Sequence, residues 1–363
     1  MQLPQIQRRS SRAVRVGKVT VGGGAPVSVQ SMTSTVTADV SATLAQVRAL
    51  AEAGADLVRV AVPTPADTAA LERIVGESPV PIIADVHFHV ERALEAIAAG
   101  AAKVRLNPGN IVDRGQVRRV IDAAGQAGVA IRVGVNEGSV VERRDAARRQ
   151  ADLARPLDEL MVERLAEYLD TFQEEGFGNL VLSAKSHDAV TCVSANRAIA
   201  QRWDYPLHLG VTHAGTAQTG AIRSAAALGS LLAEGIGDTI RISYAGDPLP
   251  EVVSGLELLY SLRLRRRPGV ELVVCPTCGR AMADIAGMAE AIRVALADLK
   301  APITVAVMGC MVNGPGEAAT ADLAVCAGEG KAVLYRRGEI IGSVAVDRVV
   351  QMVVEEARRL AGG

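Results

Sequence analysis

Short apolar runs alternate with longer stretches of helical character from residue 27 to residue 245. Within the longer stretches, apolar residues recur three and four positions apart, and many of these stretches end at glycine, as helices do. The short runs therefore predict strands, and the stretches between them predict helices. Eight strands are predicted, at residues 27–31, 57–62, 81–86, 103–107, 130–136, 179–185, 206–212 and 239–245.

This alternation predicts an α/β fold of the TIM type, a (β/α)8 barrel. A doubly wound sheet is the alternative, but such sheets usually have about five to seven strands. Residues 14–24 come before the first predicted strand, and we expect them to form a hairpin that closes the bottom of the barrel. Residues 150–165 are polar, and we expect them to lie on the surface.

The pattern changes after residues 260–271, a basic segment with a Pro-Gly pair that we expect to be a linker. Beyond it the sequence predicts a small α+β domain, with a first strand, a helix at 282–299, a strand at 302–308, further strands between 321 and 345 and a final helix from about 347. We therefore expect two domains, a barrel at 1–262 and an α+β domain at 270–363.

The composition of the chain argues against several classes of binding partner. The 363 residues include one Trp, five Tyr and three Phe, which is few for the stacking platforms that bind single-stranded nucleic acid. A net charge of −1 gives no general field for a polyanion. No apolar run is long enough to span a membrane, and five cysteines in a chain without a signal segment are poor disulfide material. We expect a soluble cytoplasmic protein that binds neither nucleic acid nor membranes.

Polar side chains gather at the carboxyl ends of the predicted strands, where barrels carry their chemistry. Side chains two apart on a strand share a face, so Arg105 pairs with Asn107, Arg132 with Asn136, Arg241 with Ser243, and Asp85 with His87. Arg59 lies inside the second strand, and Lys185 closes the sixth.

Any one of these charges alone is as well explained by a structural ion pair. Five cations from five strands instead predict a site for a small ligand with several phosphate oxygens. All five histidines, His87, His89, His187, His208 and His213, also lie in the barrel region. They are too scattered to predict a metal site, but one of them could donate a proton near neutral pH.

Three cysteines follow a spacing that metal sites use. Cys275 and Cys278 form a C-x2-C pair, Cys310 follows later, and Glu317 stands seven residues beyond it. A turn with buried thiols and a structural zinc site are alternatives, although structural zinc normally has four closed protein ligands. An iron–sulfur cluster needs thiolates on exposed turns, and the Pro and Gly residues here supply such turns. If Glu317 is the fourth ligand, it is a hard and exchangeable one on a soft cluster. Cys192 and Cys326 have no partner spacing and are predicted to be buried structural thiols.

Nine motifs then follow one another nearly from end to end of the chain: VQSMT, LVRVAVPTP, ADVHF, VRLNPGNI, IRVGVN, PLHLGVT, EGIGDTIRIS, CPTCGR and MGCMVNGPGEA. In this set and order the chain resembles the 4-hydroxy-3-methylbut-2-enyl diphosphate synthases, iron–sulfur enzymes of the non-mevalonate pathway to isoprenoid and terpenoid precursors. The resemblance implies an oxidoreductase that reductively opens the ring of 2-C-methyl-D-erythritol 2,4-cyclodiphosphate, with loss of water. Two electrons would arrive singly from ferredoxin or flavodoxin.

The resemblance also implies a substrate-binding barrel, a 4Fe-4S cluster in the second domain, and a homodimer in which the cluster domain of one subunit caps the barrel mouth of the other. It makes Cys275, Cys278, Cys310 and Glu317 the cluster ligands. It gives substrate contacts to Arg59, Asp85, Arg105, Asn107, Arg132, Asn136, Lys185, Arg241, Ser243 and Asn313.

The sequence departs from the family pattern at four places. His213 stands where the family has a glutamate that is regarded as a catalytic acid or an orienting group, and His89, Glu137 and His187 replace other usual residues. An imidazolium can donate a proton as a carboxylic acid does, so we expect His213 to be catalytic. We expect Glu317 to be catalytic as well, because it is the exchangeable ligand of the cluster. The alternatives are a paralogue with altered substrate or low activity, a transferase on a pteridine-binding-type barrel, and a non-enzymatic iron–sulfur carrier or sensor.

Overall fold

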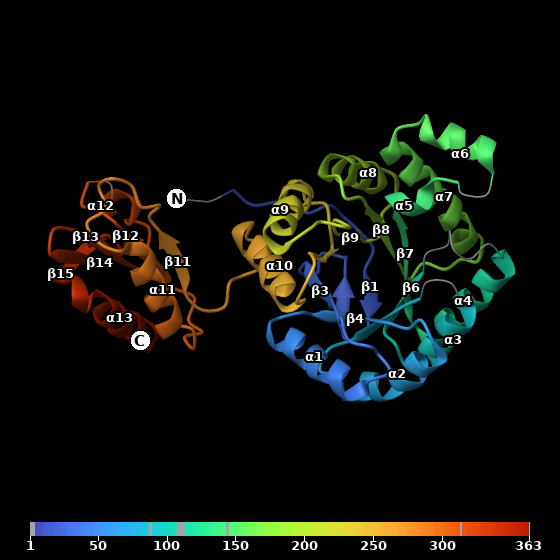
Figure 1. Ribbon diagram of the computed structural model, residues 1–363, viewed down its shortest axis with the longest axis horizontal. Coiled ribbons are helices and arrows are strands. Elements are labelled where there is room, and N and C mark those ends of the chain that lie inside the picture. The colour runs from blue at the N-terminus through green and yellow to red at the C-terminus, as the bar shows by residue number, and fades with distance from the viewer. Residues whose placement is uncertain (1–3, 87–88, 107–112, 143–144, 313, 363) are drawn as a thin grey trace. The chain divides into compact units, whose positions relative to one another are not determined.

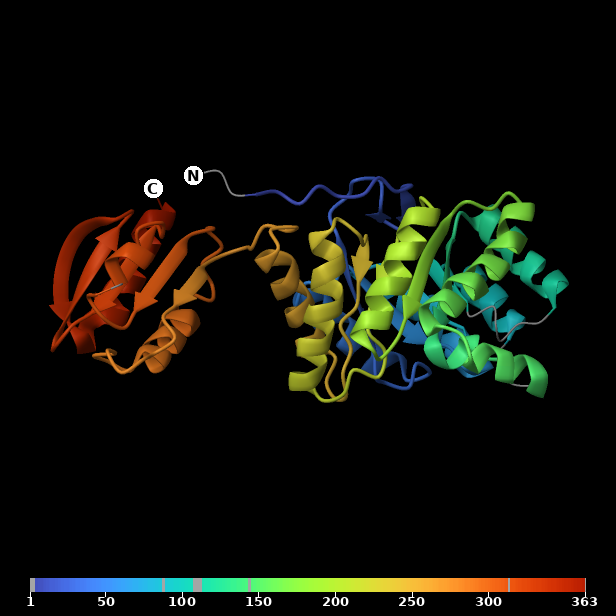
Figure 2. The ribbon, with the colours of Figure 1, turned by 90° about the horizontal axis from the view of Figure 1, so that it is seen from above.

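The computed structural model describes residues 4–362 apart from 87–88, 107–112, 143–144 and 313. The chain divides into two compact units, Met1–Arg265 and Arg266–Gly363. Figures 1 and 2 show the first unit as strands surrounded by helices and the second as a sheet with helices packed on it. Each unit has its own buried apolar core.

The first unit is a nearly closed barrel of eight parallel strands, as predicted. The strand order is β8-β7-β6-β5-β4-β3-β10-β9, and a parallel bridge between Leu182 and Leu207 links the two ends of this series. A doubly wound sheet, the alternative, would have left two free edges. The strands are β3 Ser28–Met32, β4 Leu57–Ala61, β5 Ile82–Asp85, β6 Lys103–Leu106, β7 Ala130–Asn136, β8 Leu180–Lys185, β9 His208–Leu209 and β10 Thr239–Ile240.

Helices connect the strands and cover the barrel. Several begin at a side chain that accepts a hydrogen bond from the first turn, such as Asp39 before α1 and Asp188 before α8, while Thr64 and Asp67 form a capping box at α2. The helices are α1 Val40–Glu52, α2 Pro65–Glu77, α3 Val90–Ala98, α4 Arg114–Ala127, α5 Glu137–Val140, α6 Ala146–Leu153, α7 Leu157–Glu174, α8 Ala189–Arg202, α9 Ala217–Ala233 and α10 Leu249–Ser261. No helix in the described part of the chain combines the length and apolar character of a membrane span.

A hairpin closes the bottom of the barrel, as predicted. Strands β1 Val14–Val16 and β2 Val19–Val21 pair antiparallel, and three of their valines pack on inward-facing residues at the starts of four barrel strands. We call this apolar cluster the hairpin floor; it consists of Val14, Val16, Val21, Leu57, Ile83, Ala130 and Val181. The floor seals the amino-terminal end, so the open end of the lumen is the one formed by the carboxyl ends of the strands.

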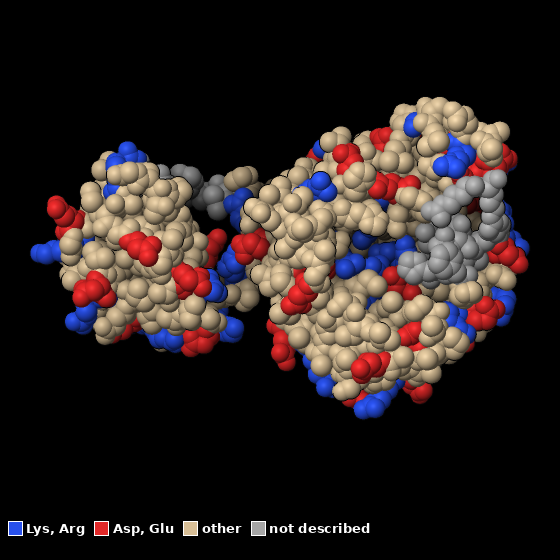
Figure 3. Space-filling view, viewed as in Figure 1, with Lys and Arg blue, Asp and Glu red and all other residues tan. Residues whose placement is uncertain are grey.

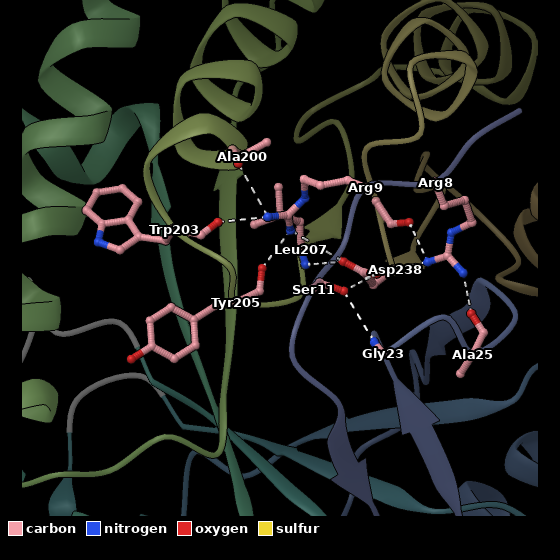
Figure 4. A network of polar contacts seen from close by, with 11 residues as sticks. Arg8, Arg9, Ser11, Gly23, Ala25, Ala200, Trp203, Tyr205, Leu207 and Asp238 are labelled. Atoms are coloured by element: carbon pink, nitrogen blue, oxygen red, sulfur yellow. Dashed lines mark hydrogen bonds and ion pairs between the residues drawn. The ribbon is translucent and has the colours of Figure 1, made fainter.

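The segment before the hairpin is fastened to the last barrel strands (Figure 4). Arg8 Nη2 and Ser11 Oγ donate to Asp238 Oδ1 over 2.8 and 2.9 Å, and Leu207 N donates to Asp238 Oδ2 over 2.8 Å. Arg9 donates to the carbonyls of Trp203 and Tyr205, each over 2.7 Å. We call Arg8, Arg9, Ser11 and Asp238 the N-terminal clamp. It holds the start of the chain against the segments that precede β9 and β10.

The second unit is a five-stranded sheet, in the order β11-β12-β13-β14-β15, with two long helices on it. Strands β11 to β13 run parallel, and the later pairs are antiparallel. Its elements are β11 Glu271–Val274, α11 Ile285–Ala295, β12 Thr304–Met308, α12 Gly314–Glu317, β13 Leu323–Ala327, β14 Lys331–Arg336, β15 Glu339–Ala345, the 3-10 helix η2 Val346–Arg348 and α13 Val349–Gly362. This is the α+β architecture that the sequence predicts.

Two details of the sequence prediction were wrong. Residues 150–165 are not simply surface, because Leu160, Met161 and Leu165 of α7 are fully buried beside the barrel. The strands predicted at 206–212 and 239–245 are each only two residues long. Their backbone nevertheless continues to bond, with Arg241 N donating to Leu209 O over 2.9 Å.

Candidate active site at the barrel mouth and the cysteine turns

Five cations line the lumen above the hairpin floor. Strand register places Asp85, Arg105 and Arg132 side by side on β5, β6 and β7, and pairs Asn136 of β7 with Lys185 of β8. Arg59 of β4 and Arg241, just past β10, complete the set. We call Arg59, Arg105, Arg132, Lys185 and Arg241 the cation ring; all but the half-buried Arg241 are buried.

Two carboxylates and a thioether hold three ring members in place. Asp85 accepts from Arg105 Nη1 over 3.2 Å and lies 3.5 Å from Arg59 Nε. Arg59 Nη2 also lies 2.9 Å from the sulfur of Met32, which Arg241 approaches at 3.6 Å. Glu251 of α10 lies 3.3 Å from Arg241 Nη2. Asp85, predicted to bind substrate, is thus already engaged by two arginines.

The remaining two ring members are less compensated. Arg132 is buried, and its Nε and Nη1 have no hydrogen-bond partner within the described structure. Burial, followed by Arg59 and Arg105, lowers the pKa of Arg132 well below its ordinary value. Burial, followed by Arg132 and Arg59, does the same to the pKa of Lys185. A guanidinium keeps its proton in proteins, so Arg132 stays charged. The lowered pKa values therefore indicate that the positive charges of the ring outweigh the nearby carboxylates, and a bound anion would neutralise the excess.

Gly210 makes room for Lys185. A Cβ at position 210 would lie 2.7 Å from Lys185 Nζ and 2.8 Å from the carbonyl oxygen of Arg241. Sequence reasoning missed Gly210, Met32 and Glu251, because their roles depend on contacts between distant strands. Figure 3 shows Lys and Arg side chains gathered in a hollow on the face of the first unit.

The other predicted substrate contacts lie at the same end of the barrel. Asn136 closes β7, and Ser243 follows β10 and donates to the carbonyl of Val211 over 3.0 Å. Asn107 and His87 lie outside the described residues. His89 is exposed at the start of α3.

His213 is exposed in the loop between β9 and α9, with a backbone φ of +51°. A positive φ is unusual for a residue other than glycine and is found most often at strained or functional positions. His213 follows Val211, whose carbonyl is bound by Ser243, so it stands on a loop that is tied to the mouth.

Two departures from the family pattern form a pair with each other. Glu137, at the start of α5, lies 2.6 Å from His187 Nδ1 and also accepts from the backbone of His187 over 3.1 Å. Burial alone would raise the pKa of Glu137, but hydrogen bonds from Ser186 and His187 outweigh it and lower that pKa. The two unusual residues therefore bind each other and join the ends of β7 and β8.

In the second unit, three cysteines leave the carboxyl ends of two neighbouring parallel strands. Cys275 follows β11, and its N–H donates to Val307 of β12 over 3.0 Å. Cys310 follows β12, and Met282 N donates to Gly309 O over 3.0 Å, which joins the two turns. Cys278 is exposed in the first turn, Cys275 is half-buried and Cys310 is buried.

This donor set fits an iron–sulfur cluster in its chemistry. Among the described side chains, no three from His, Cys, Asp and Glu are close enough to hold one metal ion. A 4Fe-4S cluster takes one ligand for each iron, so its thiolates stand further apart than the ligands of a single ion. Glu317 ends α12, and Asn313 lies outside the described residues. Cys192 and Cys326 are both fully buried, as predicted.

Each of the two units matches a known family model. Residues 11–256 match the family model described as the GcpE TIM-barrel domain, and residues 271–359 match the GcpE protein C-terminal domain. The chain belongs to the GcpE family. This membership confirms the resemblance drawn from the nine motifs.

Relatives in the GcpE family match nearly the whole chain. The 4-hydroxy-3-methylbut-2-en-1-yl diphosphate synthase (flavodoxin) of Salinispora tropica is 50% identical over 359 residues, which are 99% of this chain and 90% of that protein. The protein of the same name from Corynebacterium diphtheriae is 49% identical over 98% of this chain and 89% of its own. Among solved structures, Xanthomonas albilineans dihydropteroate synthase covers 70% of this chain and 99% of its own at 16% identity with a TM-score of 0.49, too distant a likeness to bear on function.

Proposed function

We propose that this GcpE-family protein converts 2-C-methyl-D-erythritol 2,4-cyclodiphosphate to 4-hydroxy-3-methylbut-2-en-1-yl diphosphate. The substrate's ring C–O bond to phosphate breaks, the neighbouring hydroxyl leaves as water, and two electrons and one proton are consumed. The observation that carries the proposal is the cation ring, whose five cations from five strands face one lumen. Full-length relatives that carry this name, about half identical to the chain, support it.

The cation ring binds the diphosphate in this proposal. Arg132 and Lys185, the least compensated cations, contact its oxygens directly, since buried charged donors gain most from an ionised acceptor. Arg59, Arg105 and Arg241 are oriented for the same task by Asp85 and Glu251. Asn107, Asn136, Ser243 and Asn313 make the further polar contacts.

Cys275, Cys278 and Cys310 would hold a 4Fe-4S cluster, with Glu317 as the fourth ligand. When bound, the cluster supplies electrons one at a time and offers one iron whose oxygen ligand can be exchanged. The names of the relatives support flavodoxin as the electron donor, and ferredoxin serves as the alternative. We also propose a homodimer, with the cluster unit of one subunit facing the barrel of the other, and we place the protein in the cytoplasm.

His213 donates the proton that the departing hydroxyl needs. Positioned acids of this kind contribute about a hundredfold or more to a rate. We expect His213→Ala to lower turnover by about that factor while leaving the visible spectrum of the cluster unchanged. His213→Gln, which keeps hydrogen bonding but cannot carry a proton at neutral pH, serves as the matched variant. Unchanged turnover in both variants would remove His213 from the mechanism.

The test of the function is turnover of the cyclic diphosphate by anaerobically reconstituted protein with reduced flavodoxin, followed by product formation. Product at a catalytic rate would support the proposal and show that histidine is tolerated at position 213. Protein with a full cluster, tight substrate binding and no product would identify a paralogue, and His213→Glu should then restore activity. A protein that binds no cluster would overturn the ligand assignment.

A further inference from the structure

At the level of the hairpin floor, on the amino-terminal side of the cation ring, lies a third set of lumen residues. Neither the packing of the fold nor the proposed reaction explains their polarity. Thr239 of β10 lies in register with His208 of β9 on one side and Ser28 of β3 on the other. Gln30 follows on β3, and Lys103 begins β6, four strands away from β10 around the barrel. We call Ser28, Gln30, Lys103, His208 and Thr239 the interior polar layer.

Every member of this layer is buried, and Lys103 is the largest fully buried side chain of the molecule's described part. TIM barrels normally fill this level with Val, Ile and Leu. Here Lys103 Nζ, both ring nitrogens of His208 and both amide atoms of Gln30 have no hydrogen-bond partner in the described structure. Lys103 even stands between floor residues, since its register neighbours are Ile83 and Ala130.

Positive charge outweighs negative charge in the part of the lumen around Lys103. Its electrostatic neighbours include Arg132 and Arg59, and His208 in turn has Lys185, Arg132, Lys103 and Arg59 as neighbours. Among the described residues, the charged or titratable groups that the packed elements bring to the lumen around Lys103 are Arg59, Asp85, Arg105, Arg132, Lys185, His208, Arg241 and Glu251. Burial, then Arg132 and Arg59, lowers the pKa of Lys103 from 10.5 to about 7.

An anion bound to the cation ring would raise the pKa of Lys103 again. Neighbouring negative charge favours the protonated form of an amine. Each phosphate of a cyclic diphosphate carries a single strongly acidic oxygen, so the ligand itself neither gains nor loses a proton near neutral pH.

We propose that Lys103 is a proton-uptake site coupled to the mouth of the barrel: in the free enzyme the buried cations weaken its hold on a proton, and it binds one when an anionic substrate occupies the cation ring. The inference rests on the proposed function of that ring as the substrate site. It makes Lys103 a reservoir that brings into the lumen a proton of the kind the reaction consumes.

Isothermal titration calorimetry of the oxidised holoenzyme with the cyclic diphosphate, without reductant, tests this in buffers of different ionisation enthalpy. The dependence of the heat on the buffer gives the number of protons taken up. From Lys103 we expect about half a proton at pH 7, rising toward one at pH 8 as the free amine loses its proton. Lys103→Met, of similar length but without a charge, should lower the uptake by that amount and leave only the share of Lys185, whose pKa the same field lowers. The exposed Lys331→Met should leave the uptake unchanged.

The possible outcomes distinguish a failure of the role proposed for Lys103 from a failure of the proposed substrate site. Binding by the wild type without buffer-dependent heat, or full uptake by Lys103→Met, would overturn the role of Lys103 and leave the substrate site intact. Absence of binding by the wild type would overturn the site itself.

Thermal unfolding checks that the variant is folded. Lys103 has a lower pKa folded than unfolded, so its burial destabilises the protein below about pH 7, and this effect fades as the pH rises toward 10.5. Lys103→Met should therefore raise the Tm more at pH 6 than at pH 9.

Discussion

The barrel holds two groups of arginines that differ in what surrounds them. In the N-terminal clamp, the terminal nitrogens of Arg8 and Arg9 lie against carbonyl oxygens and the carboxylate of Asp238. Within the described residues, each clamp arginine has one buried nitrogen, Nε, without a partner, whereas the more deeply buried Arg132 of the cation ring has two, Nε and Nη1. A buried cation whose terminal nitrogens are paired stabilises the fold, whereas one with an unpaired terminal nitrogen costs stability and is explained by a ligand. The partners, more than the residue type, distinguish a structural arginine from a binding one.

The largest expected effect comes from removing the least compensated arginine. Arg132→Met should lower kcat/KM for the cyclic diphosphate by about a hundredfold or more, since charge-assisted bonds to the substrate are lost. The Tm should stay the same or rise, because an uncompensated buried charge is removed. Steady-state kinetics and thermal unfolding measure both. Arg132→Lys keeps the charge and should fall between wild type and Arg132→Met; a normal kcat/KM in Arg132→Met would show that this arginine is structural after all.

A substitution in the N-terminal clamp should lower the stability of the protein and leave its activity nearly unchanged, the reverse of Arg132→Met. Asp238→Asn leaves Arg8 and Arg9 without their carboxylate, and we expect the free energy of unfolding to fall by about 3 kcal/mol. Denaturant unfolding measures this loss. Turnover of the folded enzyme should stay within about twofold, because the clamp lies at the opposite end of the barrel from the mouth. A large loss of turnover without a loss of stability would contradict the division between the two groups.

The smallest effect is expected from an exposed pair in the same N-terminal segment. Arg12 and Asp204 lie 2.8 Å apart with 47% and 58% of their side chains exposed. Asp204→Asn makes the same chemical change as Asp238→Asn, yet it should cost less than about 1 kcal/mol because water screens the pair. The same denaturant experiment compares the two variants. Equal losses would mean that burial does not set the strength of these contacts.

The cation ring could be predicted from sequence because it follows from two periodic rules. Side chains two apart share a face of a strand, and parallel strands bring their carboxyl ends together. Arg105, Arg132 and Lys185 therefore had to meet once the strands were recognised, whatever the details of the loops.

The contacts that adjust the ring could not be predicted in this way. Glu251 lies in the first turn of α10, and it reaches Arg241 because the loop between them brings Tyr244 N to the same carboxylate. Gly210 matters only because Lys185 approaches it from β8. Asp238 and Arg8 are 230 positions apart and carry no local pattern that pairs them. The buried face of α7 was missed for another reason: Leu160, Met161 and Leu165 do recur at helical spacing, but charged residues between them dominate the composition.

The clamp also sets the order in which the protein can be completed during synthesis. Arg8 and Arg9 leave the ribosome first, but the carbonyl of Gly237 and the carboxylate of Asp238 are made only 229 and 230 positions after Arg8. At a translation rate of about 5–20 residues per second, the first residues wait for some tens of seconds before their partners exist. During that interval the hairpin floor can pack on β4, β5, β7 and β8 as each emerges, while the ring of strands stays open between β3 and β9. A nascent chain paused before residue 238 would therefore expose unpaired strand edges, and chaperones would meet the protein in this half-built form.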